Sequence, residues 1–184
     1  VPVVLYVESP LDHDMPYVDV DNRQGTALAS QHLIQAGYDK IIYVGVTVDL
    51  PFAQERERGY LDTMAANHKV SRVYTVDNHS RAAEQLIFNL QTHLTANTGV
   101  VCATDRIALG VVRALNRQNG IPEKYGVVGF AGVVIDQITS PQLTTIRQPF
   151  AQIAHALVDN LFVQLHNGEL GMQRLAPDVI IRDT

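Results

Sequence analysis

Polar side chains that could bind a small molecule recur directly after the apolar stretches of this sequence. Asp19 lies in YVDVDN, Asn78 follows RVYTV, Thr104 follows GVVCA, and Gln148 follows LTTIR. Arg56 joins them from the charged stretch AQERERGY. In parallel sheets, ligands bind outside the carboxyl ends of the strands, which is where these residues are expected. Together they indicate a cleft that hydrogen-bonds a polar small molecule.

Several residues of this set and their neighbours also have a structural interpretation. Asp21 and Asp105 have the type and position of helix N-caps, and Thr104 could serve as the cap in place of Asp105. Arg56 and Arg58 alternate with glutamates, so both could form ordinary ion pairs on a helix surface. The sequence alone leaves these alternatives open.

Motifs for catalysis and for cofactors are absent from the sequence. It contains no phosphate loop with GK[ST] and no G-x-S-x-G elbow, and the glycines of GVVGFAG begin inside a strand instead of forming a dinucleotide-binding turn. The stretch DHD at 12–14 fits a solvated loop better than a metal site. Cys102, in the middle of an apolar strand, is expected to be inert. We therefore predict no catalytic residue, no metal and no cofactor.

Strand and helix patterns alternate along almost the whole chain. Continuous apolar stretches such as KIIYVGV are typical of strands buried on both faces of a parallel sheet. Strands are predicted at 1–7, 40–46, 72–76, 99–104, 125–131, 143–148 and 178–183, and helices at 23–36, 53–67, 80–96, from 104 or 105 to 120, and 150–166. This alternation predicts an α/β fold with a doubly wound, mostly parallel sheet and helices on both faces.

The composition is that of an ordinary globular protein. Of 184 residues, 46% are hydrophobic and 18% are charged, and the formal net charge is −5. Without a basic face, the chain is not expected to hold nucleic acid by itself, and no run of about 20 apolar residues could span a membrane. A single cysteine fits a reducing compartment. Because the chain opens inside a predicted strand without an initiator methionine, we expect a fragment of a longer protein.

Four segments, in this order, resemble the effector-binding domain of the LacI/GalR family of bacterial transcription regulators. They are YVDVDNRQGTALASQHLIQAGYDKIIYVG, AQERERGYLDTM, VVCATDRIALGVVRALNRQNGIPEKYGVVGF and SPQLTTIRQPFAQIAHALVDNLF. The resemblance implies two doubly wound lobes, as in type I periplasmic sugar-binding proteins, joined by three crossing connections. It divides the chain into a fragment of the amino-terminal lobe (1–18), a complete carboxy-terminal effector-binding lobe (19–144), a crossover and helix of the amino-terminal lobe (145–170), and a closing strand that returns to the carboxy-terminal lobe (171–184).

The resemblance also implies a function. Family members sense a small-molecule effector, commonly a sugar or a related polar metabolite, and thereby modulate operator binding by a helix-turn-helix head. That head, the hinge helix and most of the amino-terminal lobe are not in this chain, so operator DNA would be bound only through the missing part. A cytoplasmic regulator without a membrane partner is expected. A solute-binding protein of a transport system with the same fold is the alternative, and a small α/β enzyme is a third interpretation.

We also expect a homodimer. The predicted helix at 150–166 presents an apolar stripe that includes Phe150, Ile153, Leu157, Leu161 and Leu165. An exposed apolar face of that size needs a partner, and family dimers use both lobes.

The resemblance assigns the effector site residue by residue. Arg56 matches an arginine that binds effector hydroxyls or carboxylate, Thr104 stands where an effector-binding asparagine is common, and Asp19 and Gln148 would line the cleft. Asn78 belongs to the same set by its place after a strand. The chain departs from the family at GFAG, where Ala131 replaces an aspartate that accepts hydrogen bonds from sugar hydroxyls. The effector is therefore expected to be larger than a simple hexose, or phosphorylated and oriented by the arginine, or bound instead by the aspartate and glutamine.

Overall fold

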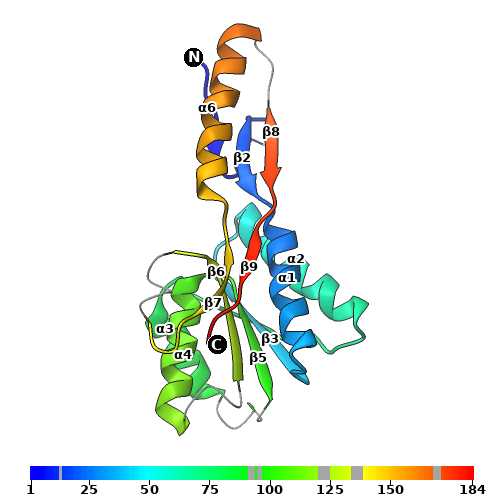
Figure 1. Ribbon diagram of the computed structural model, residues 1–184, viewed down its shortest axis with the longest axis vertical. Helices are drawn as coiled ribbons and strands as arrows, with labels where there is room; N and C mark the ends of the chain where they lie inside the picture. The colour runs from blue at the N-terminus through cyan, green and yellow to red at the C-terminus, as the bar shows by residue number, and fades with distance from the viewer. Residues whose placement is uncertain (13, 91–93, 95–96, 120–124, 134–138, 168–170) are drawn as a thin grey trace.

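The larger of two β-sheets has six strands in the computed structural model of the chain (Figure 1). The structure describes residues 1–12, 14–90, 94, 97–119, 125–133, 139–167 and 171–184. The strand order is β4-β3-β5-β6-β7-β9, and all neighbours are parallel except β7 and β9. The strands are β3 (Lys40–Val46), β4 (Val73–Val76), β5 (Thr98–Cys102), β6 (Tyr125–Ala131), β7 (Thr144–Arg147) and β9 (Asp178–Ile180).

Four helices cover this sheet, two on each face (Figure 1). Helices α1 (Asn22–Gln35) and α2 (Pro51–Ala66) pack against each other on one face, and α3 (Ser80–Asn89) and α4 (Asp105–Asn119) do so on the other. Apolar side chains of the central strands and all four helices form one buried cluster between the layers. The predicted doubly wound, mostly parallel α/β fold is confirmed.

A glycine allows α1 and α2 to approach closely. A Cβ atom at Gly59 of α2 would lie 2.2 Å from the carbonyl oxygen of Arg23 in α1, far inside the 3.4 Å at which ordinary contact begins. Glycine is therefore required here by space and not by backbone conformation. This contact determines how far the side chains of α2 lie from the start of α1.

The smaller sheet joins segments from both ends of the chain. Its order is β1 (Leu5–Tyr6), β2 (Tyr17–Val20) and β8 (Met172–Leu175), all parallel. Helix α6 (Phe150–Asn167) packs on it, with Ile153 and Ala156 against Val18 in a second, small core. Figure 1 shows this unit above the large sheet.

The chain passes between the two sheets three times, and these passages correct the boundaries proposed from sequence. The first follows Val20, so Asp19 belongs to the small sheet and not to the start of the larger lobe. The second follows Arg147, because β7 is a full member of the large sheet. The third follows Leu175, which divides 171–184 into β8 in the small sheet and β9 in the large one. The wider division into family lobes stays a prediction.

Other expectations from the sequence were wrong in part. The predicted strand 1–7 is reduced to two residues, and Val1 and Val3 are exposed. The strands β2 and β8 were not predicted. Within α6, Ile153 is buried but Phe150 and Leu165 are exposed, so only part of the predicted stripe packs on the sheet. The predicted helix ends near 96 and 120 lie outside the described residues. Over the described part of the chain, no helix is both long and apolar enough to cross a membrane.

Candidate functional site

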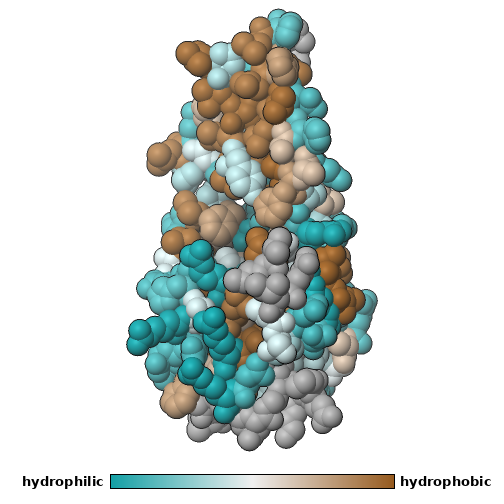
Figure 2. Space-filling view, turned by 60° about the vertical axis from the view of Figure 1, so that its left-hand side comes forward, coloured by the Kyte–Doolittle hydropathy of each residue, from teal (hydrophilic) through white to brown (hydrophobic). Residues whose placement is uncertain are grey.

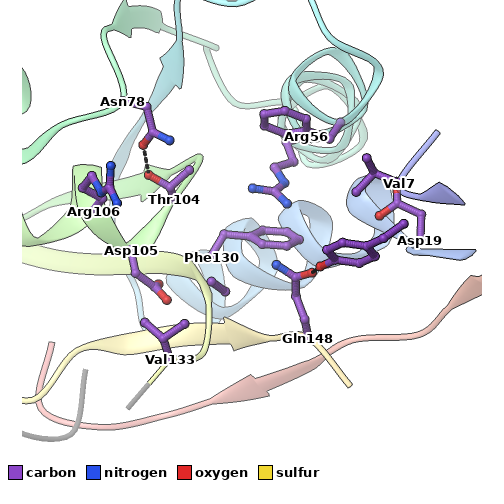
Figure 3. Close-up of a pocket in the computed structure, with 13 residues that line it drawn as sticks. Val7, Asp19, Arg56, Asn78, Thr104, Asp105, Arg106, Phe130, Val133 and Gln148 are labelled. Atoms are coloured by element: carbon purple, nitrogen blue, oxygen red, sulfur yellow. Dashed lines mark hydrogen bonds between the residues drawn. The ribbon is translucent and has the colours of Figure 1, made fainter. Parts of the chain in front are cut away.

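A cavity of about 380 Å³ opens at the carboxyl ends of the large sheet's strands, facing the small sheet (Figure 3). This volume is within the usual range for small-molecule sites. All six residues proposed from sequence, Asp19, Arg56, Asn78, Thr104, Ala131 and Gln148, line it. Its other lining residues are Tyr6, Val7, Phe52, Asp105, Arg106, Phe130 and Val133. The structure thus brings the proposed residues together, and their contact with an effector stays a prediction.

Arg56 is the most deeply buried cation of the cavity wall, with only 7% of its surface exposed. Its Nε donates to Asn22 Oδ1 at 2.8 Å, and one Nη donates to the Ala103 carbonyl at 2.7 Å. The guanidinium carbon lies 3.7 Å from the ring centre of Phe130 and 4.9 Å from that of Phe52, a favourable cation–π arrangement. Burial lowers the pKa of Arg56 to about 10, so it remains charged at neutral pH.

Asn22 connects Arg56 to Asp19. Its amide nitrogen donates to Asp19 Oδ2 at 3.2 Å and to the Val20 carbonyl at 3.1 Å, while its oxygen accepts from Arg56. Asp19 also accepts from the Val20 amide at 2.7 Å. Burial raises the pKa of the Asp19 carboxyl, and these hydrogen bonds and the Arg56 charge oppose that rise. The asparagine therefore fixes both charged groups although it does not line the cavity itself.

The stretch DNRQG at 21–25, where α1 begins, explains how this helix supports the site. Asp21 caps α1 by accepting from the Gln24 amide at 2.8 Å, as predicted. Gly25 leaves room for Phe130, since a Cβ there would lie 2.6 Å from the ring. The ring can then lie beneath the guanidinium of Arg56.

The opposite wall is formed where β5 ends and α4 begins. Thr104 caps α4 by accepting from the Ile107 amide at 3.2 Å, and its hydroxyl donates to Asn78 Oδ1 at 2.8 Å. Because the Asn78 oxygen is used in this way, its amide nitrogen is left to face the cavity (Figure 3). Arg106, which is exposed, lies on the same side.

Asp105 is not the helix cap that the sequence also allowed. It is buried, accepts from the Thr145 hydroxyl at 2.5 Å, and accepts from the Gly132 amide at 2.8 Å. A Cβ at Gly129 would lie 2.2 Å from its carboxylate. Through these contacts the aspartate connects β6, β7 and the turn after Ala131 at the edge of the cavity.

Gln148 connects the two sheets across the cavity. Its Oε1 accepts a hydrogen bond of 3.0 Å from the hydroxyl of Tyr6 in β1. Burial, followed by the charge of Asp19, raises the pKa of this tyrosine. Gln148 thus lies at a passage between the sheets and faces the cavity. Ala131, at the end of β6, also lines the cavity, and its side chain offers no hydrogen-bonding group.

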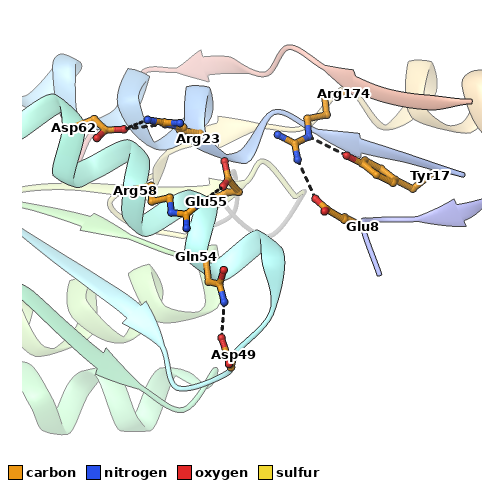
Figure 4. Close-up of polar contacts among 9 residues, drawn as sticks. All are labelled: Glu8, Tyr17, Arg23, Asp49, Gln54, Glu55, Arg58, Asp62 and Arg174. Carbon is orange, nitrogen blue, oxygen red and sulfur yellow. Dashed lines mark hydrogen bonds and ion pairs between the residues drawn. The ribbon is translucent and has the colours of Figure 1, made fainter. Parts of the chain in front are cut away.

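The two arginines of the ERER stretch differ in whether they form an ion pair. Arg58 pairs with Glu55 at 3.0 Å on the surface of α2, as the structural interpretation proposed. Arg56 forms none of the ion pairs found in the described part of the chain, so that interpretation was wrong for it. Figure 4 shows the Arg58 pair beside that of Arg23 with Asp62.

Sequence reasoning missed the aromatic wall and the bridging asparagine. From the sequence we expected ordinary apolar or strand positions for Phe52, Phe130 and Tyr6, and only a place at a helix start for Asn22. The burial of this asparagine comes from the fold and left no signal in the sequence. His13, of the DHD stretch, lies outside the described residues. Among the rest of the chain that is described, no group of three or more His, Cys, Asp or Glu could hold a metal ion.

Comparison with known proteins identifies the fold family. The sequence pattern of the family described as periplasmic binding protein-like domain matches residues 30–184. The chain belongs to this family. The expected resemblance to LacI/GalR-type regulators is also confirmed, because the relatives it matches bear such names.

Two relatives and one solved structure illustrate the similarity. The HTH-type transcriptional regulator YvdE of Bacillus subtilis, itself described as uncharacterized, is 34% identical over the whole chain. The regulator GalR of Escherichia coli is 32% identical over 78% of the chain. The chain spans 58% and 45% of their respective lengths. A LacI family transcriptional regulator from Mycobacterium smegmatis superposes with a TM-score of 0.82 at 26% identity, covering 91% of this chain and 65% of that one.

Proposed function

We propose that this periplasmic binding protein-like domain senses a small polar effector, carbohydrate in type, for a LacI/GalR-type transcription regulator. In this proposal a helix-turn-helix head, of the kind that the names of its relatives mention, binds operator DNA. The domain acts in the cytoplasm and carries out no catalysis.

One observation carries the proposal. A buried arginine, an aspartate and several amide and hydroxyl groups converge on a single cavity between two sheets that the chain connects three times. Aromatic rings beside the guanidinium provide apolar faces against which a sugar ring can pack. A ligand held between the two sheets would change their relative position, which is a common route from binding to a distant response.

Titration calorimetry with pentoses, hexoses, disaccharides and their acidic derivatives tests this function. Arg56→Ala should weaken binding of the effector by about 2–3 kcal/mol, the usual effect of removing a buried charge-assisted hydrogen bond. Arg58→Ala is the matched control, because that arginine pairs on the surface of the same helix. Unchanged affinity in Arg56→Ala, or equal losses in both variants, would refute a sensing role for this cavity.

A homodimer is the expected assembly. Apolar side chains of α6 remain exposed beside its packed face, and they include Phe150, Val158, Phe162 and Leu165. Figure 2 shows apolar surface gathered over this upper part of the molecule. Light scattering should report a mass of two or more chains, and a monomer at high concentration would contradict this expectation.

A further inference from the structure

The charge of Arg56 is buried without a counter-charge in contact. Its two hydrogen-bond partners, Asn22 Oδ1 and the Ala103 carbonyl, are neutral, and it forms no ion pair within the described residues. A buried cation is costly unless an anion pairs with it. Neither hydrogen bond uses its second Nη group, and the guanidinium extends into the cavity in Figure 3. An anion in the cavity would supply the missing partner.

Further donors surround the same space on the side of α4. Asn78 has its oxygen engaged by Thr104, so it presents its amide hydrogens. Arg106 adds a second guanidinium on that wall (Figure 3). Helix α4, of 15 residues, begins at Asp105 in this wall, so the positive end of its dipole lies beside the cavity. These donors face Arg56 from the opposite wall, where the buried Asp105 carboxylate already accepts from Thr145 and Gly132.

Asp19 lies on the Arg56 side of the cavity, linked to the arginine through Asn22. The Asp19 carboxylate accepts from the backbone amides of Val20 and Glu8 and from Asn22, and it retains acceptor capacity for a hydroxyl group. Figure 3 shows it across the cavity from Asn78 and Arg106. A ligand that satisfies both the aspartate and the donors carries hydroxyl groups as well as negative charge.

We propose that the effector is an acidic carbohydrate, bearing a phosphate or a carboxylate, with its anionic group held by Arg56, Arg106 and Asn78. This rests on the proposed sensing function and specifies its ligand class. The absence of an acceptor at Ala131 agrees with this orientation, since a carboxylate there would bring a third negative side chain to a cavity that already contains Asp19 and Asp105.

Matched pairs of neutral and acidic sugars test the proposal on the whole chain by calorimetry. The probes are glucose with glucose 6-phosphate and glucuronate, galactose with its 6-phosphate and galacturonate, and ribose with ribose 5-phosphate. At least one acidic probe should bind about tenfold or more tightly than its neutral counterpart, the effect of one added charge-assisted contact. The phosphate and carboxylate members distinguish the two acidic groups.

Two variants locate the anionic group. Asn78→Asp keeps the acceptor for Thr104 and replaces the donor by a negative charge, so it should abolish the preference for the acidic probe. Arg106→Gln, at an exposed position, should reduce that preference severalfold while the unfolding midpoint stays unchanged. Tighter or equal binding of a neutral sugar, with affinity still dependent on Arg56, would overturn the acidic class and leave the sensing function standing. Failure of every probe, neutral or acidic, would overturn both.

Discussion

Replacing Gly59 by alanine tests whether the close approach of α1 and α2 places Arg56 in the cavity. In an ordinary helix this change stabilises the protein by about 1 kcal/mol, because alanine has the higher helix propensity. Here the new Cβ would lie 2.2 Å from the carbonyl oxygen of Arg23, so the helices must separate by roughly 1 Å to restore ordinary contact. The obstacle is backbone and cannot rotate away.

The expected effect is a net loss of stability. Overpacking costs about 1–3 kcal/mol, and a shift that breaks the hydrogen bond from Arg56 to Asn22 adds about 1.5–3 kcal/mol. After the gain in propensity, Gly59→Ala should lower the free energy of unfolding by about 1.5–5 kcal/mol. Urea unfolding followed by circular dichroism measures this as a lower midpoint at an unchanged slope.

Gly25→Ala is the informative comparison. Its Cβ would meet side-chain atoms, 2.6 Å from the Phe130 ring and 3.0 Å from an Ile146 methyl group, which can move. We expect a smaller stability loss, about 1–2 kcal/mol, together with weaker effector binding because the ring beneath Arg56 shifts. If Gly59→Ala instead raises stability by about 1 kcal/mol, propensity alone governs the position and the reasoning is wrong.

Two further predictions concern groups away from the cavity. Tyr43 and Tyr60 stack with ring centres 5.4 Å apart, but the Tyr60 hydroxyl bonds the Ile41 carbonyl and the Arg72 amide, whereas no hydrogen bond of the described residues reaches the Tyr43 hydroxyl. Tyr60→Phe should therefore lower the free energy of unfolding in urea by about 1–2 kcal/mol. Tyr43→Phe should leave it unchanged. Equal losses in the two variants would contradict this prediction. Burial lowers the pKa of His32, so the unfolded chain takes up the proton first and stability is lost as pH falls through 6.5. His32→Gln should lessen this loss of stability at low pH. Identical profiles of unfolding free energy against pH for the wild type and the variant would contradict the prediction.

The central strands were predictable because burial on both faces leaves an uninterrupted apolar pattern. KIIYVGV and YGVVGFA correspond to β3 and β6 with nearly the expected ends. The four residues of β8, MQRL, are mostly exposed, so no apolar pattern marks them as a strand. In YVDV the buried Asp19 interrupts the apolar pattern of β2, and only its neighbours in space account for its burial.

The cavity was predictable in part for a similar reason. Residues that follow parallel strands meet at one edge of a sheet, so Asn78, Thr104 and Gln148 were found from position alone. The burial of Arg56 could not be read from the alternating charges around it, since it depends on the spacing of α1 and α2. Asp105 had the local pattern of a helix cap, but tertiary contacts with β6 and β7 determine its role.

The pairing of β2 with β8 also constrains the order in which the protein can fold during synthesis. Strands β3 to β7 and the four helices around them lie in one continuous stretch, so these five strands of the large sheet can assemble while the chain is still emerging, before β9 is made. Tyr17 pairs with Met172, and the small sheet must wait for that distant partner. Contacts so far apart in sequence form slowly because a long loop has to close first. Until then the apolar side chains of β2, such as Val18, have neither α6 nor β8 to cover them. The segment that forms β1 and β2 is therefore exposed to aggregation and to proteolysis until α6 and β8 have been made.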